Sequence, residues 1–253
     1  MKRTSAAILG ILLILSVMAG AQTKKPATPA DFGQWENLAR PGAHGGLSPD
    51  GRWLAYGINR SDRNSELRVL KLADGTVKVA AFGGQPVFSS DSKWVAYSIG
   101  MSEADQDKLK KDKKPVHNKL GLLDLGSGET TILDDIESFA FSRDGAFLAM
   151  DHYAPAPPAG PREGSGGGSA GSDADEEKPG TQVIVRNLAS GKDVAFGNVS
   201  QFAWQDADRT HLLALAISAE GKAGNGVQLF DAATGVLRVL DSSASIYTGL
   251  AWR

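Results

Sequence analysis

A turn followed by a short apolar strand recurs along the chain, and this repeat limits the possible folds more than any other feature. Each copy has an apolar anchor residue, then a Ser/Asp/Gly turn, then the strand. There are three clear copies, a weaker fourth and a fifth anchor, at Leu47, Phe88, Phe141, Trp204 and Trp252. A second turn recurs inside each unit, with its glycine at Gly75, Gly128, Gly191 and Gly235.

The distances between these landmarks are constant in only one half of the unit. From each turn glycine to the next anchor the distance is 13, 13, 13 and 17 residues, whereas from anchor to glycine it is 28, 40, 50 and 31. A period of roughly 40 residues with short strands and turn glycines is typical of a β-propeller or a related array. We therefore expect an all-β fold, an incomplete propeller with about four four-stranded blades and the start of a fifth.

The strand after each turn is apolar on both faces. In Trp53-Leu54-Ala55-Tyr56, alternation places Trp53 and Ala55 on one face and Leu54 and Tyr56 on the other. The same pattern recurs at residues 94–97 and 147–150. Blades of a propeller pack against neighbours on both faces, so an apolar pattern on both faces agrees with this fold.

Two insertions account for the variable half of the unit, at residues 101–116 and 154–180. Both fall between the second and third strands of adjacent blades, so we expect them to leave the sheets on the same side. The segment 154–180 is rich in Pro, Gly, Ser, Ala and acidic residues. It has too few apolar residues to form a core, and we predict that it is disordered.

The insertion at 101–116 is charged and carries helix signals. Ser102 followed by Asp105 predicts an N-cap, and Asp107 and Lys111 have the spacing of a helical ion pair. Residues 108–114 are locally basic. This segment is either a solvated helix and loop or a docking patch for an acidic partner.

The N-terminus predicts export to the periplasm or the extracellular space. Residues 1–21 have a basic start, an apolar run and a small-residue cleavage site, which indicates a signal peptide and no membrane anchor after its removal. Residues 22–45 form a polar lead-in, with a helical turn expected near 31–40, and the partial propeller occupies 46–253. Without the signal peptide the chain has 25 Lys and Arg against 29 Asp and Glu, a net charge of −4, which gives no support for nucleic-acid binding.

The sequence provides no catalytic, cofactor-binding or metal-binding residue that we would assign, and we expect no cofactor. The chain has no cysteine, which excludes thiol catalysis and Cys-based zinc sites. Residues 167–171 match the Gly-x-Ser-x-Gly pattern around Ser169. That pattern requires a preceding strand and a following helix, and a Gly/Ser tract produces it by chance.

The remaining candidate residues have structural interpretations. No two histidines have metal-ligand spacing; the four are His44, His117, His152 and His211. Asp151 and His152 are the one adjacent carboxylate–imidazole pair, which we interpret as a surface feature. Three turn aspartates could suggest repeated calcium sites, but capping of local backbone N–H groups is the better interpretation for Asp50, Asp91 and Asp144.

The repeat also resembles a known family. Residues 47–56 are similar to the PD40, or TolB-like, propeller repeat. The chain beyond the leader resembles the N-terminal propeller of exported bacterial prolyl oligopeptidase-like serine peptidases of family S9, at residues 31–68, 108–121 and 198–253. This resemblance implies a propeller of seven or eight blades that limits access to a C-terminal α/β-hydrolase domain, which carries a Ser-Asp-His triad.

The sequence contains no hydrolase domain, so the resemblance places no catalytic residue in it. We expect a fragment that acts as the scaffold and gate of such a peptidase and is inactive alone. Its partners would be the missing hydrolase domain or a peptide substrate. The alternative is a non-enzymatic periplasmic TolB-like propeller that binds a protein partner on the insertion-bearing face. A propeller hydrolase using its central channel is disfavoured, because no cluster of carboxylates or histidines converges in the sequence.

Overall fold

The structure is a computed structural model that describes residues 26–39, 46–155, 180–207 and 210–253. The chain divides into two compact units, residues 1–35 and 36–253. The described part of the first unit contains the 3-10 helix η1 (Pro29–Gln34). Its N-cap, Thr28, donates from its backbone N–H and its hydroxyl to Asp31, both at 2.7 Å. The helical turn thus lies earlier than residues 31–40, because Pro29 and Asp31 supply its start.

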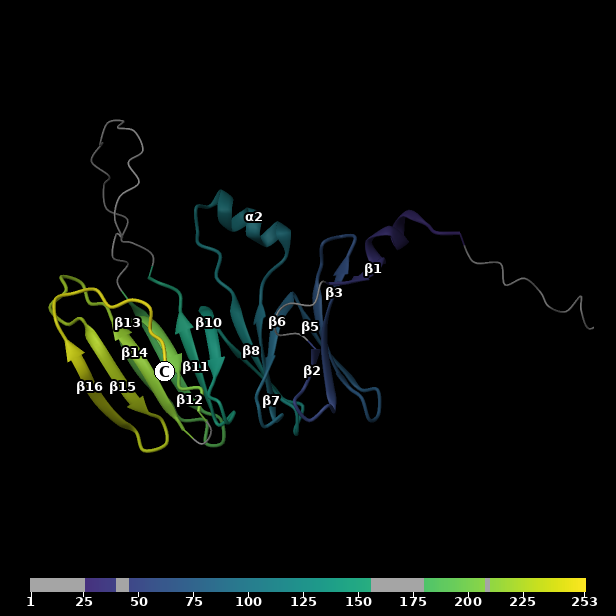
Figure 1. The fold of residues 1–253 in the computed structure, drawn as a ribbon. Coiled ribbons are helices and arrows are strands. Elements are labelled where there is room, and N and C mark those ends of the chain that lie inside the picture. The colour runs from purple at the N-terminus through teal and green to yellow at the C-terminus, as the bar shows by residue number, and fades with distance from the viewer. Residues whose placement is uncertain (1–25, 40–45, 156–179, 208–209) are drawn as a thin grey trace, which may run out of the picture. The chain divides into compact units, whose positions relative to one another are not determined.

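The second unit begins with blade 1 (Figure 1), which has four strand positions. Its strands, from the innermost outward, are β1 (Glu36–Leu38) with β2 (Gly46–Leu47), then β3 (Trp53–Arg60), β4 (Glu66–Lys71) and β5 (Val77–Ala81). Both short strands pair antiparallel with β3 and together fill the innermost position. The sheet therefore begins at Glu36, within the predicted lead-in. A strand of three residues is too short to reveal itself by alternation.

Blade 2 is a separate four-stranded antiparallel sheet. It contains β6 (Gly83–Phe88), β7 (Trp94–Ile99), β8 (Lys119–Asp124) and β9 (Thr130–Leu133). The first insertion leaves this sheet between its second and third strands and forms helix α2 (Glu103–Lys111). The second insertion lies in the same place of blade 3, between β11 and β12, and its residues 156–179, Ser169 included, are outside the described part.

Blades 3 and 4 form one continuous sheet of seven strands. Its strands are β10 (Ile136–Phe141), β11 (Phe147–His152), β12 (Thr181–Asn187), β13 (Asp193–Trp204), β14 (Leu212–Ile217), β15 (Gly226–Asp231) and β16 (Val236–Ser242). The long strand β13 belongs to both blades. Its first part is the outermost strand of blade 3 and pairs with β12, and its second part is the innermost strand of blade 4 and pairs with β14.

Each blade ends in a hairpin whose turn requires glycine. The four turn glycines have φ between 68° and 75°, where residues with a side chain are strained. Each donates its N–H to the carbonyl four residues earlier at 2.8–2.9 Å, as Gly75 does to Lys71. The predicted hairpins are confirmed by this repeated geometry, seen at Gly75, Gly128, Gly191 and Gly235.

The Ser/Asp turns between the first and second strands are also identical in three blades. The buried hydroxyl of Ser48 donates to Asp50 at 2.6 Å and accepts the N–H of Trp53 at 3.0 Å. Asp50 also accepts the backbone N–H of Arg52. The same bonds recur around Ser89 with Asp91 and around Ser142 with Asp144. The prediction that these aspartates cap local N–H groups is confirmed.

A left-handed residue marks each passage from one blade to the next. Phe82, Asp135 and Asn198 have φ of 56°, 58° and 58°. Each carbonyl accepts an N–H from the end of the next blade's second strand; Gly100 donates to Phe82, for example, at 2.9 Å. The equivalent distances at Asp135 and Asn198 are 3.1 Å and 2.7 Å. The inter-blade passage is therefore a repeated structure, although its sequence varies.

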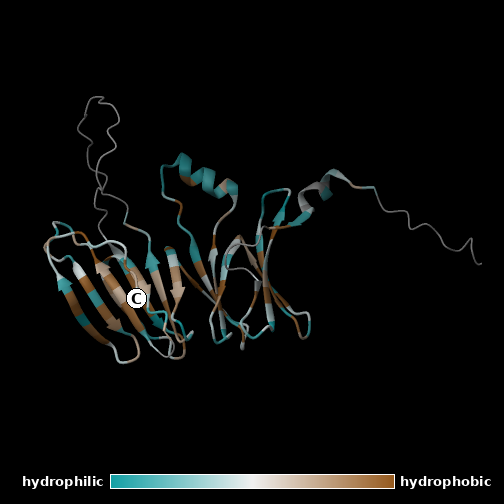
Figure 2. Cartoon of the chain, in the orientation of Figure 1, coloured by the Kyte–Doolittle hydropathy of each residue, from teal (hydrophilic) through white to brown (hydrophobic). Residues whose placement is uncertain are grey.

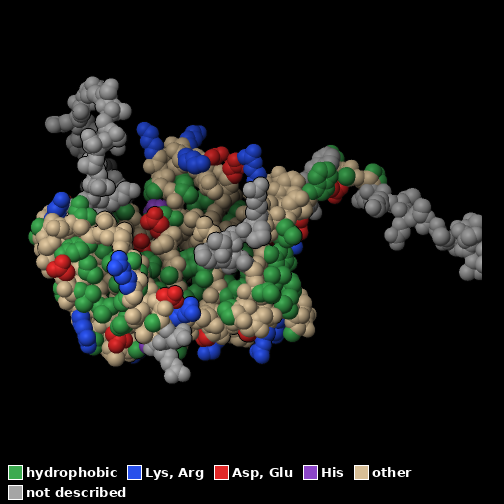
Figure 3. Space-filling view, in the orientation of Figure 1, with side chains coloured by type: hydrophobic (Ala, Val, Ile, Leu, Met, Phe, Trp, Pro, Cys, Tyr) green, Lys and Arg blue, Asp and Glu red, His purple; other side chains and the backbone are tan. Residues whose placement is uncertain are grey.

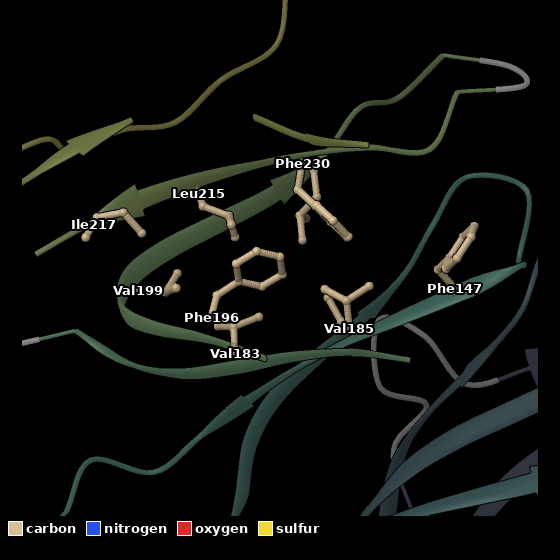
Figure 4. Packing of buried hydrophobic residues seen from close by; sticks show 10 residues of the cluster. Phe147, Val183, Val185, Phe196, Val199, Leu215, Ile217 and Phe230 are labelled. Carbon is tan, nitrogen blue, oxygen red and sulfur yellow. The ribbon is translucent and has the colours of Figure 1, made fainter. Parts of the chain in front are cut away.

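The core lies between blades, as the alternating pattern predicts. In Figure 2 most strands are brown or banded, whereas α2 is largely teal. One apolar cluster joins blades 1 and 2, a second joins blades 2 and 3, and the largest joins blades 3 and 4. In that largest cluster Phe196 and Phe230 meet edge to face, with ring centroids 4.8 Å apart (Figure 4). The all-β, four-stranded-blade architecture is confirmed, and the sheets do not close into a ring.

Candidate functional site: a groove along the innermost strands

A groove of about 920 Å³ runs over the innermost strands of blades 2, 3 and 4. In a propeller these strands face the central channel. The lining comes from β6, β10, the end of β13, the turns that follow them, and Pro49 in the first turn of blade 1. Groups of different chemistry line it: aromatic Phe139, Phe141 and Trp204, and polar Gln85, Glu137, Arg143, Gln205 and Asp206.

Trp204 connects the groove to the core. Its indole N–H donates to the carbonyl of Ala140 on β10 at 3.0 Å. Its ring lies 6.3 Å from that of Phe147, inside the cluster between blades 3 and 4. One wall of the groove is thus fixed by a hydrogen bond and by packing at the same residue.

The turn end of the groove is fixed by contacts between neighbouring blades. The hydroxyl of Ser90 in blade 2 donates to the carbonyl of Arg143 in blade 3 at 2.7 Å. The guanidinium of Arg143 lies 3.1 Å from the carboxylate of Asp206 in blade 4. The side-chain oxygen of Gln205 is buried and has no hydrogen-bond partner within the described residues. The groove therefore presents positive, negative and amide groups beside aromatic surface.

The histidines do not form a catalytic site within the described residues. His117 stacks on Tyr153 with ring centroids 4.2 Å apart, and its Nδ1 lies 3.1 Å from Asp135. His211 lies 3.2 Å from Asp144. The hydroxyl of Ser142 is bonded to Asp144 and not to an imidazole, so the described contacts give Ser142 no histidine that could activate it. His44 lies outside the described residues.

Asp151 and His152 are half-buried and not fully exposed, and their interpretation as a surface feature with no catalytic role stays a prediction. They point to opposite faces of β11, as neighbours on a strand must. Asp151 accepts a hydrogen bond from Thr181. Burial raises the pKa of Asp151, the bond from Thr181 opposes that rise, and the nearby charge of Glu137 adds to it. In the described part of the chain, no group of three or more His, Asp or Glu side chains could hold a metal ion.

Sequence reasoning missed an ion-pair network on the face of blade 1 that points away from blade 2. Glu66 is 8 % exposed and bonds Arg60 at 2.7 Å and Arg68 at 2.6 Å. Glu36 bonds the same two arginines at 2.9 Å and 2.7 Å. These bonds lower the pKa of both glutamates, and those from Glu36 and Glu66 raise the pKa of Arg68. Glu66 and Arg68, two residues apart on one strand, were the signal in the sequence for a charged face. The fourth residue of the network, Glu36, could not be found in this way because it lies on β1.

The segment 243–253 extends the repeat by one inner-strand position. The indole of Trp252 donates to the carbonyl of Ala203 at 3.1 Å. Ala140 and Ala203 each precede an anchor, so this bond repeats that of Trp204 one blade further on. Gly249 and Leu250 also donate their N–H groups to the side chain of Gln201. Trp252 is an anchor as predicted, although the segment forms no strand.

No helix in the described part of the chain is both long enough and apolar enough to cross a membrane.

No family model and no curated protein matches the chain. Solved structures similar to it include the β-propeller domain of the trilobed protease from Pyrococcus furiosus, with 12 % identity and a TM-score of 0.45. That match covers 82 % of this chain and 58 % of the other. The acylaminoacyl peptidase of Pyrococcus horikoshii has 14 % identity and a TM-score of 0.43, with 83 % and 33 % covered.

TolB from Acinetobacter baumannii is a further similar structure, at 15 % identity and a TM-score of 0.37, with 82 % of this chain and 44 % of TolB covered. The chain thus spans less than two thirds of the length of each of these three proteins. These values leave the activity unassigned, and the blade architecture rests on the strand pairing described above.

Proposed function

We propose that this chain is the propeller portion of an exported prolyl oligopeptidase-like serine peptidase. Its role would be to hold a hydrolase domain and to limit which peptides reach it. Residues 1–21 would be removed on export to the periplasm or beyond. Cleavage of the amide bond would belong to the hydrolase domain.

The groove along the innermost strands is the observation that carries this proposal. It has room for an extended peptide, because about 920 Å³ is at the upper end of the range of ligand pockets. Aromatic surface at Phe139 and Trp204 can contact apolar side chains, while Glu137 and the Arg143–Asp206 pair can orient polar ones. A peptide in this groove would contact several blades. The width of the groove and its charged side chains would determine which peptides fit.

The contact of Trp252 with blade 4 supports an assembly larger than four blades. This residue takes the anchor position of a fifth blade, with the same indole–carbonyl bond that joins blade 4 to blade 3. A propeller that gates a second domain needs a channel enclosed by blades, and a fifth blade placed by this bond would extend the array toward one.

Activity labelling of the purified 253-residue chain tests the assignment. A fluorophosphonate probe, which reacts with activated serines, is expected to leave this chain unlabelled. Labelling of the chain would contradict the proposal. The source DNA after the codon for Arg253 is then expected to encode further blades and a strand–Gly-x-Ser-x-Gly–helix segment, and an immediate stop codon would exclude the peptidase assignment for this product.

The gating role has its own test in the longer product. Ser138 is exposed and lines the groove, so Ser138→Trp should narrow it. We expect kcat/KM to fall for long peptides and to stay unchanged for a small ester. Thr131→Trp, on the exposed outermost strand of blade 2, is the matched control. Equal kcat/KM values for Ser138→Trp and Thr131→Trp would show that the groove does not gate.

The second candidate function is a non-enzymatic, TolB-like propeller that binds a protein partner. Helix α2 favours it, because a helix without buried residues on the insertion-bearing side contributes surface and no core. A stop codon after Arg253 together with a stable complex would support this function over the first.

A further inference from the structure

The C-terminal end of α2 carries five lysines within seven residues. We call residues 108–114 the lysine turn; its lysines are Lys108, Lys110, Lys111, Lys113 and Lys114. Among the described residues only Lys110 has a carboxylate within 4 Å, that of Asp107 at 3.8 Å. The predicted ion pair of Asp107 with Lys111 is therefore wrong, because Asp107 pairs with Lys110, three residues away. Figure 3 shows both basic (blue) and acidic (red) side chains over α2.

The other acidic residues of α2 are engaged at its opposite end. Glu103 forms an ion pair with Arg63, from the loop between β3 and β4 of blade 1. Asp105 accepts the hydroxyl of Ser102 at 2.6 Å, and its backbone N–H donates to that hydroxyl, which confirms the predicted N-cap. These contacts fix the start of the helix, and the lysine turn at its end carries five lysines against one acidic residue, Asp112.

In the lysine turn, Lys113 occupies a backbone position at which glycine is usual. The N–H of Lys114 bonds the carbonyl of Leu109 at 2.8 Å, and that of Lys113 bonds Lys110 at 3.0 Å. This is a Schellman ending, in which the residue at the position of Lys113 is usually glycine. Lys113 adopts φ of 53°, a conformation that costs a residue with a side chain stability. Lys113 thus closes the helix and at the same time places a further positive charge in the lysine turn.

We propose that the lysine turn is a docking site for an acidic polypeptide segment. Carboxylates complement this surface, because its five lysines outnumber its one acidic residue. A lipid surface fits less well, because Leu109 is the one large apolar residue of the turn and is half-buried. This surface is separate from the groove, so the inference holds or fails independently of the proposed peptidase role.

Binding of a synthetic octaglutamate peptide to the full chain tests the inference. Isothermal titration at an ionic strength of about 0.01 M, where charges act over about 30 Å, should detect binding, and about 0.15 M salt should weaken it. The variant Lys111→Gln/Lys113→Gln/Lys114→Gln should bind at least about tenfold more weakly. The control Lys78→Gln/Lys93→Gln/Lys192→Gln changes net charge equally on exposed sites elsewhere and should bind like the unmodified chain.

Lys113→Gly separates charge from helix stability. Glycine relieves the strained backbone, so the thermal stability of α2, followed by circular dichroism, should rise or stay constant while peptide affinity falls about twofold. A merely structural role for Lys113 would leave affinity unchanged or raise it.

Two results would overturn the proposal. Equal loss of affinity in the two triple variants would mean that net charge and not this surface binds the peptide. Binding to phosphatidylglycerol vesicles that is lost in the Lys111/Lys113/Lys114 variant, with no octaglutamate binding, would assign the surface to a membrane.

Discussion

The outward faces of blade 1 and blade 4 belong to the same kind of four-stranded sheet but end the array differently. Blade 1 presents the closed ion-pair network of Glu66 with its arginines, over a face that has no neighbouring blade within the described residues. Blade 4 has apolar residues on that side of β14 and β15; among them Ala216 is fully buried, and segment 243–253 is bonded along β13. One end of the repeat is finished with charge, and the other carries the segment 243–253 along its innermost strand.

Replacing the two equivalent tryptophans, Trp204 and Trp252, by alanine should produce the largest difference in the free energy of unfolding between the two ends. Trp204 packs between two blades, so Trp204→Ala is expected to lower the free energy of unfolding by about 3 kcal/mol. Trp252 has the same hydrogen bond but packs on one blade, and Trp252→Ala should cost about 1 kcal/mol. Urea denaturation measures both. Equal losses would remove the distinction between an interior anchor and an end anchor.

The ion-pair network on blade 1 should make the free energy of unfolding depend on pH in the acidic range. Its bonds lower the pKa of Glu66, so the stability that this carboxylate provides is present above the ordinary glutamate pKa of 4.5 and is lost as the pH falls below it. At neutral pH, Glu66→Gln should lower the free energy of unfolding by more than the roughly 1 kcal/mol of an exposed pair. The difference from the unmodified chain should shrink below about pH 4.5. A pH-independent difference would mean that packing and not charge matters there.

Replacing a turn glycine should cost the same stability in blade 1 as in blade 4. Gly75 in blade 1 and Gly235 in blade 4 have φ of 75° and 73°, and an added Cβ would meet no atom within 4 Å at either. Gly75→Ala and Gly235→Ala should each therefore cost about 1 kcal/mol, from backbone strain alone. Thermal denaturation of the two variants compares them. Unequal costs would indicate that the neighbouring blade reaches into the hairpin.

Asp151 provides the contrasting case of a half-buried carboxylate without an arginine. Burial raises its pKa, so its ionised form opposes folding at neutral pH, and this penalty disappears as the pH falls below the ordinary aspartate pKa of 3.8. Asp151→Asn keeps an acceptor for Thr181 and should raise the free energy of unfolding at pH 7 by less than about 1 kcal/mol. Destabilisation at pH 7 would show that an unseen partner stabilises the charge.

The blades could be predicted from the sequence because each depends on short-range chemistry. A turn glycine, a Ser-x-Asp cap and alternating apolar residues act within a few positions, so Gly128 or Ser142 identifies its own turn. The N-cap of α2 at Ser102 follows the same logic. These local rules also placed both insertions between the correct strands.

The groove and the ion-pair network depend on pairing between distant segments. Trp204 meets Ala140 across 64 residues, and Arg68 meets Glu36 across 32. Alternation assigns a residue to a face but does not say which residue of another strand stands opposite. For this reason β1, with three residues and no clear pattern, was expected to be part of the lead-in.

The shared strand β13 has a consequence for how the molecule opens. A single ladder of backbone hydrogen bonds runs through all seven strands of blades 3 and 4, whereas blades 1 and 2 are separate sheets. Amide protons throughout β10–β16 should therefore exchange with solvent as one cooperative block. Those of blades 1 and 2 should exchange in two further blocks, each with its own protection factor.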